Sequence, residues 1–173
     1  MDTQLLVVAP HALACVTSAF NANPNPPQNY GYRVEYEPPA EIWPDDICCE
    51  GLGYVSIGDV WPSVDSFPDA DIIRQVRGNC PPAAWGVQFR LGIMRCTVAD
   101  IQPTQAEEDA AFIQDLYDID ALMTAACCFR TYFTTDPQWL GYNVVIERMN
   151  KTIQGGCKDR YVPISIQLPN CVC

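Results

Sequence analysis

The feature that most constrains this fold is a long helical pattern that begins after Pro103. Thr104 and Glu107 form a capping box, in which the threonine side chain accepts from the amide three residues on and the glutamate reaches back to the amide of Thr104. Apolar side chains then recur on one broad face, at Phe112, Ile113, Leu116, Tyr117, Ile119, Met123 and Cys127. A broad apolar face needs burial, so the pattern predicts a long helix that covers a sheet through these residues.

Alternating residues predict the sheet that this helix covers. Between residues 85 and 93, apolar side chains occupy every second position, which is the pattern of a half-buried strand. Gly86 and Gly92 stand on the opposite face and indicate close packing or a bulge there. Further strand candidates are 52–57, 140–149 and 162–168, and Pro163 favours an edge position for the last of them.

The N-terminal part of the chain predicts a second, shorter helix. Residues 10–20 place Leu13, Val16 and Phe20 at helical spacing, with Pro10 near the first turn. Residues from about 21 to 44 are rich in Asn, Pro and Tyr and indicate an irregular excursion rather than a linker. The whole chain, 1–173, is therefore expected to form one α+β domain. Its antiparallel or mixed β-sheet would be covered by one long capped helix and a short N-terminal helix.

Ten cysteines in 173 residues are unusual for a cytosolic protein and suggest disulfides or metal. Adjacent cysteines bridge only through a strained ring, so the two Cys-Cys pairs would need distant partners. Cys-x-x-Cys spacing does not occur, and the Cys171-Val-Cys173 end has no histidine nearby, which argues against zinc. We expect most thiols to be small buried hydrophobic side chains, with late-forming disulfides as the alternative. The candidate structural cysteines are Cys48, Cys49, Cys80, Cys96, Cys127, Cys128 and Cys157.

No motif in the sequence resembles a known catalytic site. The single histidine, His11, lies in an apolar helical start without the signature of a serine or cysteine nucleophile. Gly155-Gly156 precedes Cys157 rather than Lys followed by Ser or Thr, so it indicates a turn and not a phosphate-binding loop. Ten Lys+Arg residues against 21 Asp+Glu give a net charge of −11, which argues against binding nucleic acid through counterion release. We expect no enzymatic activity, no cofactor and no metal.

The N-terminus resembles a short signal sequence but departs from one in its flanks. An apolar run at 5–9 is followed by Ala14-Cys15, yet Asp2 makes the leading flank acidic and Pro10 interrupts the run. Apolar stretches also fall short of the roughly 20 residues that a membrane span requires. We expect a soluble protein made and kept in a cytoplasm. A secreted cysteine-rich binding module, with Asn150-Lys151-Thr152 as a glycosylation sequon, is an alternative.

An ordered set of motifs runs from about residue 45 to residue 168. It comprises Ile47-Cys48-Cys49-Glu50-Gly51-Leu52, Phe67-Pro68 in a Pro-rich loop, Cys80, the strand end Leu91-Gly92-Ile93-Met94-Arg95-Cys96, the capped acidic helix with Ala125-Ala126-Cys127-Cys128, and Gly155-Gly156-Cys157 before a closing strand. In this order the motifs resemble the head-to-tail connector proteins of long-tailed (siphovirus) actinobacterial phages, usually assigned as tail terminators. The chain departs from the pattern at 21–44 and in its Cys-Val-Cys end.

The resemblance implies a structural virion protein that forms a six-fold ring at the top of the tail tube. Its partners would be further copies of itself, the major tail tube protein and the head-side stopper, and DNA would pass through the ring without specific binding. Assembly would take place in the bacterial host cytoplasm, without a membrane. Another neck protein, such as a head-closure protein or stopper, is the main alternative, and a small enzyme or metal protein is a distant one.

Two groups of charged residues supply candidate surfaces for such a ring. The acidic group lies opposite the expected apolar face of the long helix and comprises Glu107, Glu108, Asp115 and Asp118. The basic group comprises Arg148, Lys151, Lys158 and Arg160. The plain interpretation of the acids is a solvated face. Alternatively they line the channel and repel DNA, or they meet the basic group of a neighbouring subunit and set the registry of the ring, which would then respond to salt.

Overall fold

The computed structural model describes residues 4–33, 50–63, 67–69, 84–97, 103–137, 142–154 and 156–168. Its elements are, in chain order, α1 (Gln4–Asn21), β1 (Asn29–Arg33), β2 (Leu52–Pro62), β3 (Trp85–Cys96), α3 (Gln105–Thr135), β4 (Val144–Ile146), β5 (Asn150–Gln154) and β6 (Cys157–Leu168). The strands form one mixed sheet of order β1-β2-β3-β6-β4, and β5 also pairs with β6. β1 is parallel to β2, and the other pairs are antiparallel. The predicted α+β class, with a mixed sheet and two helices, is confirmed.

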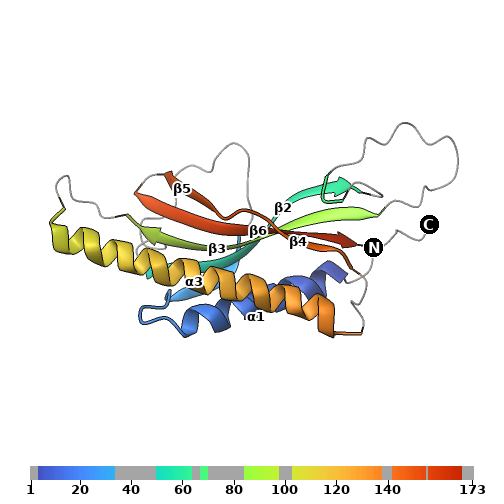
Figure 1. Ribbon diagram of the computed structural model, residues 1–173, viewed down its shortest axis with the longest axis horizontal. Helices are drawn as coiled ribbons and strands as arrows, with labels where there is room; N and C mark the ends of the chain where they lie inside the picture. The colour runs from blue at the N-terminus through green and yellow to red at the C-terminus, as the bar shows by residue number, and fades with distance from the viewer. Residues whose placement is uncertain are drawn as a thin grey trace, which may run out of the picture.

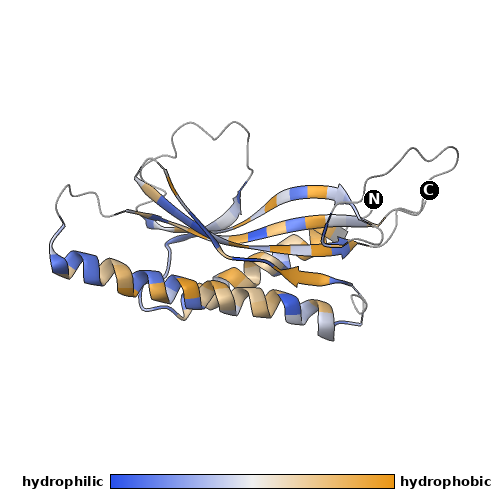
Figure 2. Cartoon of the chain, turned by 45° about the horizontal axis from the view of Figure 1, so that its top comes forward, coloured by the Kyte–Doolittle hydropathy of each residue, from blue (hydrophilic) through white to orange (hydrophobic). Residues whose placement is uncertain are grey.

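Both helices lie side by side on the same face of the sheet (Figure 1). The core between the layers is built from every second residue of β3 and β6 and from aromatic residues of α3. Figure 2 shows the resulting alternation of apolar and polar residues along the strands. Phe129 packs edge-on against Phe89 at 5.7 Å and against Phe133 at 5.1 Å between ring centroids. Such a core fixes the sheet-facing side of α3 from Asp118 onward, where all its buried residues lie.

The two strand glycines have the close contacts that the sequence predicted. A Cβ atom on Gly86 would lie 2.2 Å from Cε2 of Trp61, and one on Gly92 would lie 2.3 Å from Cζ of Tyr54. The aromatic rings of β2 therefore rest on the glycines of β3, on the sheet face opposite the helices. Tyr54 is fully buried there and donates a hydrogen bond to Asp159 of β6.

The predicted edge position of Pro163 is wrong, because β6 lies between β3 and β4. In an antiparallel strand the N–H and C=O of one residue point to the same neighbour. The carbonyl of Pro163 accepts from the amide of Glu147, so its missing N–H also faces this side. Here β4 has ended and β5 has not begun, so the proline falls in a gap of the ladder and no strand hydrogen bond is lost.

The N-terminal region is more regular than predicted. α1 begins at Gln4 rather than at residue 10, so Pro10 lies inside the helix. Proline there removes the bond to the carbonyl of Leu6, but both residues are exposed and water can hydrate that carbonyl. Within the excursion expected at 21–44, residues Asn29–Arg33 form β1, while residues 34–44 lie outside the described part of the chain. The strand expected at 140–149 is shortened to β4.

Candidate functional site

The surface of α3 that faces away from the core carries large apolar side chains. Phe112, Leu116 and Met123 are 64%, 50% and 58% exposed. We define the α3 apolar stripe as the exposed residues Phe112, Ile113, Leu116, Tyr117 and Met123. A contiguous group of large exposed apolar side chains on a folded subunit marks an interaction surface.

The predicted covering face of α3 is therefore wrong, although the helix does cover the sheet. The face that packs on it carries Asp118, Ala121, Leu122, Ala125, Ala126, Phe129 and Phe133. Small alanine side chains let the helix approach its neighbours, and the two phenylalanines fill the space over β3 and β6. Of the face expected to be buried, the stripe residues and Cys127 are exposed and Ile119 is half-buried.

Asp118 is buried because Arg95 of β3 lies opposite it. The Arg95 guanidinium donates to both carboxylate oxygens, from Nε at 2.8 Å and from Nη2 at 3.0 Å. Gln114 donates to the same carboxylate from the preceding turn of the helix, at 3.0 Å. Arg95 also donates to the carbonyl of Asn25, which ties the segment between α1 and β1 to this pair. Asp118 is 1% exposed and cannot line a channel or face a neighbouring subunit, so this candidate is corrected.

Asp115 forms ion pairs with three of the four predicted basic residues of its own subunit. Lys158 and Arg160 of β6 bind its carboxylate, the arginine at 3.1 Å, and Lys151 of β5 lies 3.7 Å away. Burial, together with the charges of Arg160 and Arg95, lowers the pKa of Lys158 below its ordinary value. The two charged groups that were candidates for contact between subunits thus meet inside one subunit at these positions. Arg148, the fourth residue of the basic group, is exposed and makes no ion pair with Asp115.

The other two acids of the group lie at the start of α3 and are exposed. Glu107 closes the capping box predicted from the sequence: its carboxylate accepts from the amide of Thr104 at 2.7 Å, while its own amide bonds the Thr104 side chain. The backbone N–H of Thr104, and then its hydroxyl, donate to the Glu107 carboxylate, and these two hydrogen bonds lower the pKa of Glu107. Glu107 therefore has a structural role, and Glu108 beside it stays free to face solvent or a partner.

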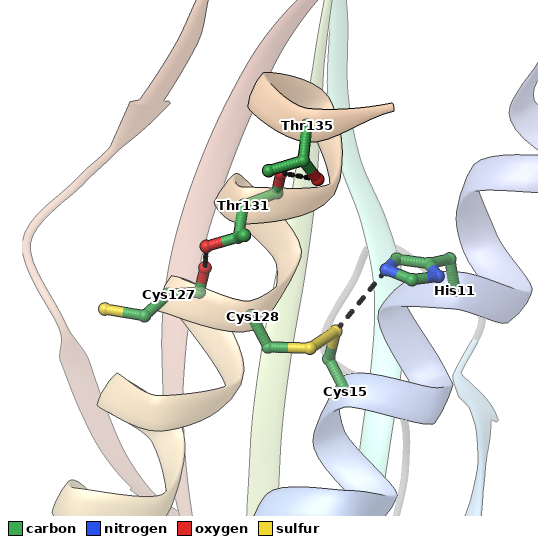
Figure 3. The surroundings of a disulfide bond; sticks show 6 residues. All are labelled: His11, Cys15, Cys127, Cys128, Thr131 and Thr135. Carbon is green, nitrogen blue, oxygen red and sulfur yellow. Dashed lines mark hydrogen bonds between the residues drawn. A yellow bond between two sulfur atoms is a disulfide. The ribbon is translucent and has the colours of Figure 1, made fainter. Parts of the chain in front are cut away.

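Among the described cysteines, disulfide-bonded residues outnumber free thiols, which differs from the buried, unpaired side chains expected for most of the ten. Cys15 of α1 and Cys128 of α3 form a disulfide across 113 residues of sequence, with their Cα atoms 5.8 Å apart (Figure 3). Cys96 and Cys157 are disulfide-bonded as well. Cys127 is a free, exposed thiol that points away from the bridge. Cys48, Cys49 and Cys80 lie outside the described residues.

His11 lies one helical turn before Cys15, on the side of α1 that contacts α3. Its ring stacks on Tyr132 of α3 with centroids 3.7 Å apart, and its Nε2 lies 3.8 Å from Sγ of Cys15. Burial lowers the pKa of His11, and the negative charge of Asp136 partly opposes this shift. His11 thus belongs to the contact between the two helices.

Sequence reasoning missed two residues of this region, Arg95 and Cys15. The signal for Arg95 was its position on β3, because it continues the same alternation as the buried residues before it. The signal for Cys15 was its four-residue spacing from His11, which places both on one face of α1.

Comparison of the chain with known protein families and with curated proteins finds no match. No helix among the described residues has the length and apolar character needed to cross a bilayer.

Proposed function

We propose that this chain is a structural protein of a phage head–tail junction, a tail terminator that assembles into a closed ring around the DNA path. The observation that carries the proposal is the α3 apolar stripe, which is exposed on the isolated subunit. Its occupant is a second copy of the same chain. The order of sequence motifs described above and the net charge of −11 support the assignment.

A ring needs two different surfaces on each subunit, because one face of a subunit meets another face of the next. The stripe lies on α3, and most of it precedes the buried part of that helix. A second exposed apolar pair, Ile57 and Val60, lies in the distal half of β2, where the pairing with β3 shifts register. In Figure 1 the start of α3 and the distal end of β2 lie at opposite ends of the long axis of the molecule. Two apolar surfaces so placed suit contact between successive copies.

Apolar burial rather than charge then holds the copies together. Asp115 and Asp118, which could have aligned neighbouring subunits through ion pairs, are paired with basic residues of their own subunit. Association through the stripe should therefore change little between low and high salt, because burial of apolar surface does not depend on unpaired charges. The salt response expected from the sequence would instead favour contact through Glu108 and Arg148.

The stripe is tested by placing charge on it. We expect Phe112→Asp combined with Leu116→Asp to weaken self-association at least about 100-fold, because two buried side chains of this size contribute about 3 kcal/mol. Both side chains are exposed in the subunit, so its unfolding free energy should change by no more than about 0.5 kcal/mol per site. Sedimentation velocity over a range of concentrations measures the association, and urea unfolding measures the fold.

The matched control is Thr131→Asp combined with Thr134→Asp, which adds the same two negative charges at exposed positions of α3 outside the stripe. It should associate as the unmodified chain does. Equal association of the Phe112/Leu116 variant and the control would exclude the stripe as the interface and remove the main support for the ring.

A second candidate function, a secreted cysteine-rich binding module, is favoured by the disulfides. Such bonds persist in oxidising compartments, and four of the five described cysteines are bonded. Asn150 of the sequon is exposed at the start of β5. Mass spectrometry of the protein from its native source separates the candidates: a processed N-terminus or a glycan on Asn150 supports the secreted module, whereas recovery within intact phage particles supports the tail protein.

A further inference from the structure

Three metal-ligating side chains meet where α1 and α3 cross. The ligand atoms of His11, Cys15 and Cys128 all lie within 4.8 Å of one another. Figure 3 shows the imidazole of His11 directed at the sulfur of Cys15, with Cys128 joining from the opposite helix. Two sulfurs and one imidazole nitrogen are the donor set of many zinc sites, and three protein ligands leave the fourth position open.

The spacing of these atoms fits a tetrahedral ion once the disulfide is broken. With Zn–S near 2.3 Å and Zn–N near 2.0 Å, a tetrahedral site separates two sulfurs by about 3.8 Å and a sulfur from a nitrogen by about 3.5 Å. The distance from His11 Nε2 to Cys15 Sγ is already 3.8 Å. The sulfur of Cys128 has only to rotate away from that of Cys15, because their Cα atoms are 5.8 Å apart across the helix interface.

The surroundings both hold the ligands and admit an ion. Tyr132 stacks on His11 and keeps the imidazole in this orientation. A groove of about 500 Å³ between the helices is lined by Cys15 and Cys128 together with Ser18, Asp120 and Thr124 among others. Cys128 is exposed and Cys15 is buried, so an ion entering by the groove would lie at the surface of the helix interface.

We propose that reduction of the Cys15–Cys128 disulfide converts this position into a zinc site with His11, Cys15 and Cys128 as ligands and water in the fourth place. Reduction breaks the S–S bond with two electrons and two protons, supplied in a cell by a dithiol that becomes a disulfide. Binding of Zn²⁺ then releases the two thiol protons, because thiolate is the form that ligates the metal. The cross-link between α1 and α3 is kept in both states, by a covalent bond when oxidised and by the ion when reduced. This inference does not depend on ring formation.

The test uses the full chain, reduced with a phosphine, which takes up oxygen from water as it becomes the phosphine oxide. Co²⁺ is titrated as a coloured substitute for Zn²⁺, and bound Zn²⁺ is counted by competition with a chromophoric chelator. Reduced unmodified chain should bind one more equivalent of tightly held ion than Cys128→Ser, with thiolate-to-cobalt absorption that this variant lacks. His11→Ala should bind this equivalent at least about 10-fold more weakly.

Cys127→Ser is the matched control, because it removes the neighbouring thiol that points away from the site. It should bind as the unmodified chain does, and any contribution from the other cysteines is common to all variants. Zn²⁺ should also raise the melting temperature of the reduced chain and of Cys127→Ser, but not that of the oxidised chain. Equal binding by the unmodified chain, Cys128→Ser and His11→Ala would overturn the proposal, as would a loss on Cys127→Ser equal to that on Cys128→Ser.

Discussion

Replacing Asp118 with alanine should lower the free energy of unfolding by about 3–5 kcal/mol. The substitution leaves the Arg95 guanidinium, whose side chain is only 11% exposed, without the carboxylate that accepts from its Nε and Nη2. A buried cation without its partner is far more costly than the loss of the pair as a whole. Urea unfolding followed by circular dichroism measures the change.

Two further variants make this prediction specific. Glu108→Ala removes an exposed acid from the same helix and should change the stability by less than about 0.5 kcal/mol. Arg95→Met combined with Asp118→Leu removes both charges and should recover much of the loss, because apolar residues often replace a buried ion pair at little cost. An Asp118→Ala variant as stable as Glu108→Ala would show that the pair does not fix α3 on the sheet.

Removing the disulfide between the helices should have an effect of similar size. Cys15→Ala combined with Cys128→Ala should lower the stability of the oxidised protein by about 4 kcal/mol, since the bond closes a loop across 113 residues. The bond lowers the conformational entropy of the unfolded chain, and this stabilising effect grows with the length of the loop that the bond closes. Urea unfolding without reductant gives the change, and peptide mapping identifies the bonded cysteines.

Cys127→Ala is the control for the disulfide, because this adjacent thiol is free and exposed. It should leave both the stability and the peptide map of the bridge unchanged. If the double variant unfolds at the same urea concentration as this control, the two helices are not joined in the protein.

Local patterns predicted the elements of this fold well. The capping box at Thr104 marked the start of α3, and alternation of apolar residues marked β3, because both signals depend on neighbours along the chain. Gly86 and Gly92 were predicted to mark close packing for the same kind of reason, the absence of a side chain on one strand face. These expectations needed no knowledge of what lies across the sheet.

The burial of α3 could not be predicted in this way. The helix has two apolar faces, and the larger side chains of the α3 apolar stripe gave the stronger pattern. The buried face contains alanines and an aspartate, and Asp118 is accommodated only because Arg95 comes from a strand 23 residues earlier in the chain. Because the wrong face of α3 was predicted to pack on the sheet, Asp115 and Asp118 were predicted to face solvent or a neighbouring subunit.

Pairing across long distances accounts for the other errors. Cys15 and Cys128 come together because α1 and α3 pack side by side, which their local sequences do not reveal. Proline favours an edge strand because it cannot donate a hydrogen bond to a continuous ladder. Pro163 lies opposite the gap between β4 and β5, where the ladder is interrupted, so an inner strand accommodates it. In the candidate site, the sequence indicated the charged residues and Cys128 but missed Arg95 and Cys15, whose partners lie far along the chain.

The mass of the native assembly tests the central claim most directly. Native mass spectrometry of the oxidised, unmodified chain, with negative-stain microscopy of the same sample, should show closed rings of identical copies. The resemblance implies six copies in each ring. Those rings should persist in high salt and be lost in the Phe112→Asp, Leu116→Asp variant. A chain that stays monomeric at every concentration, both alone and with tail tube protein, would contradict the account.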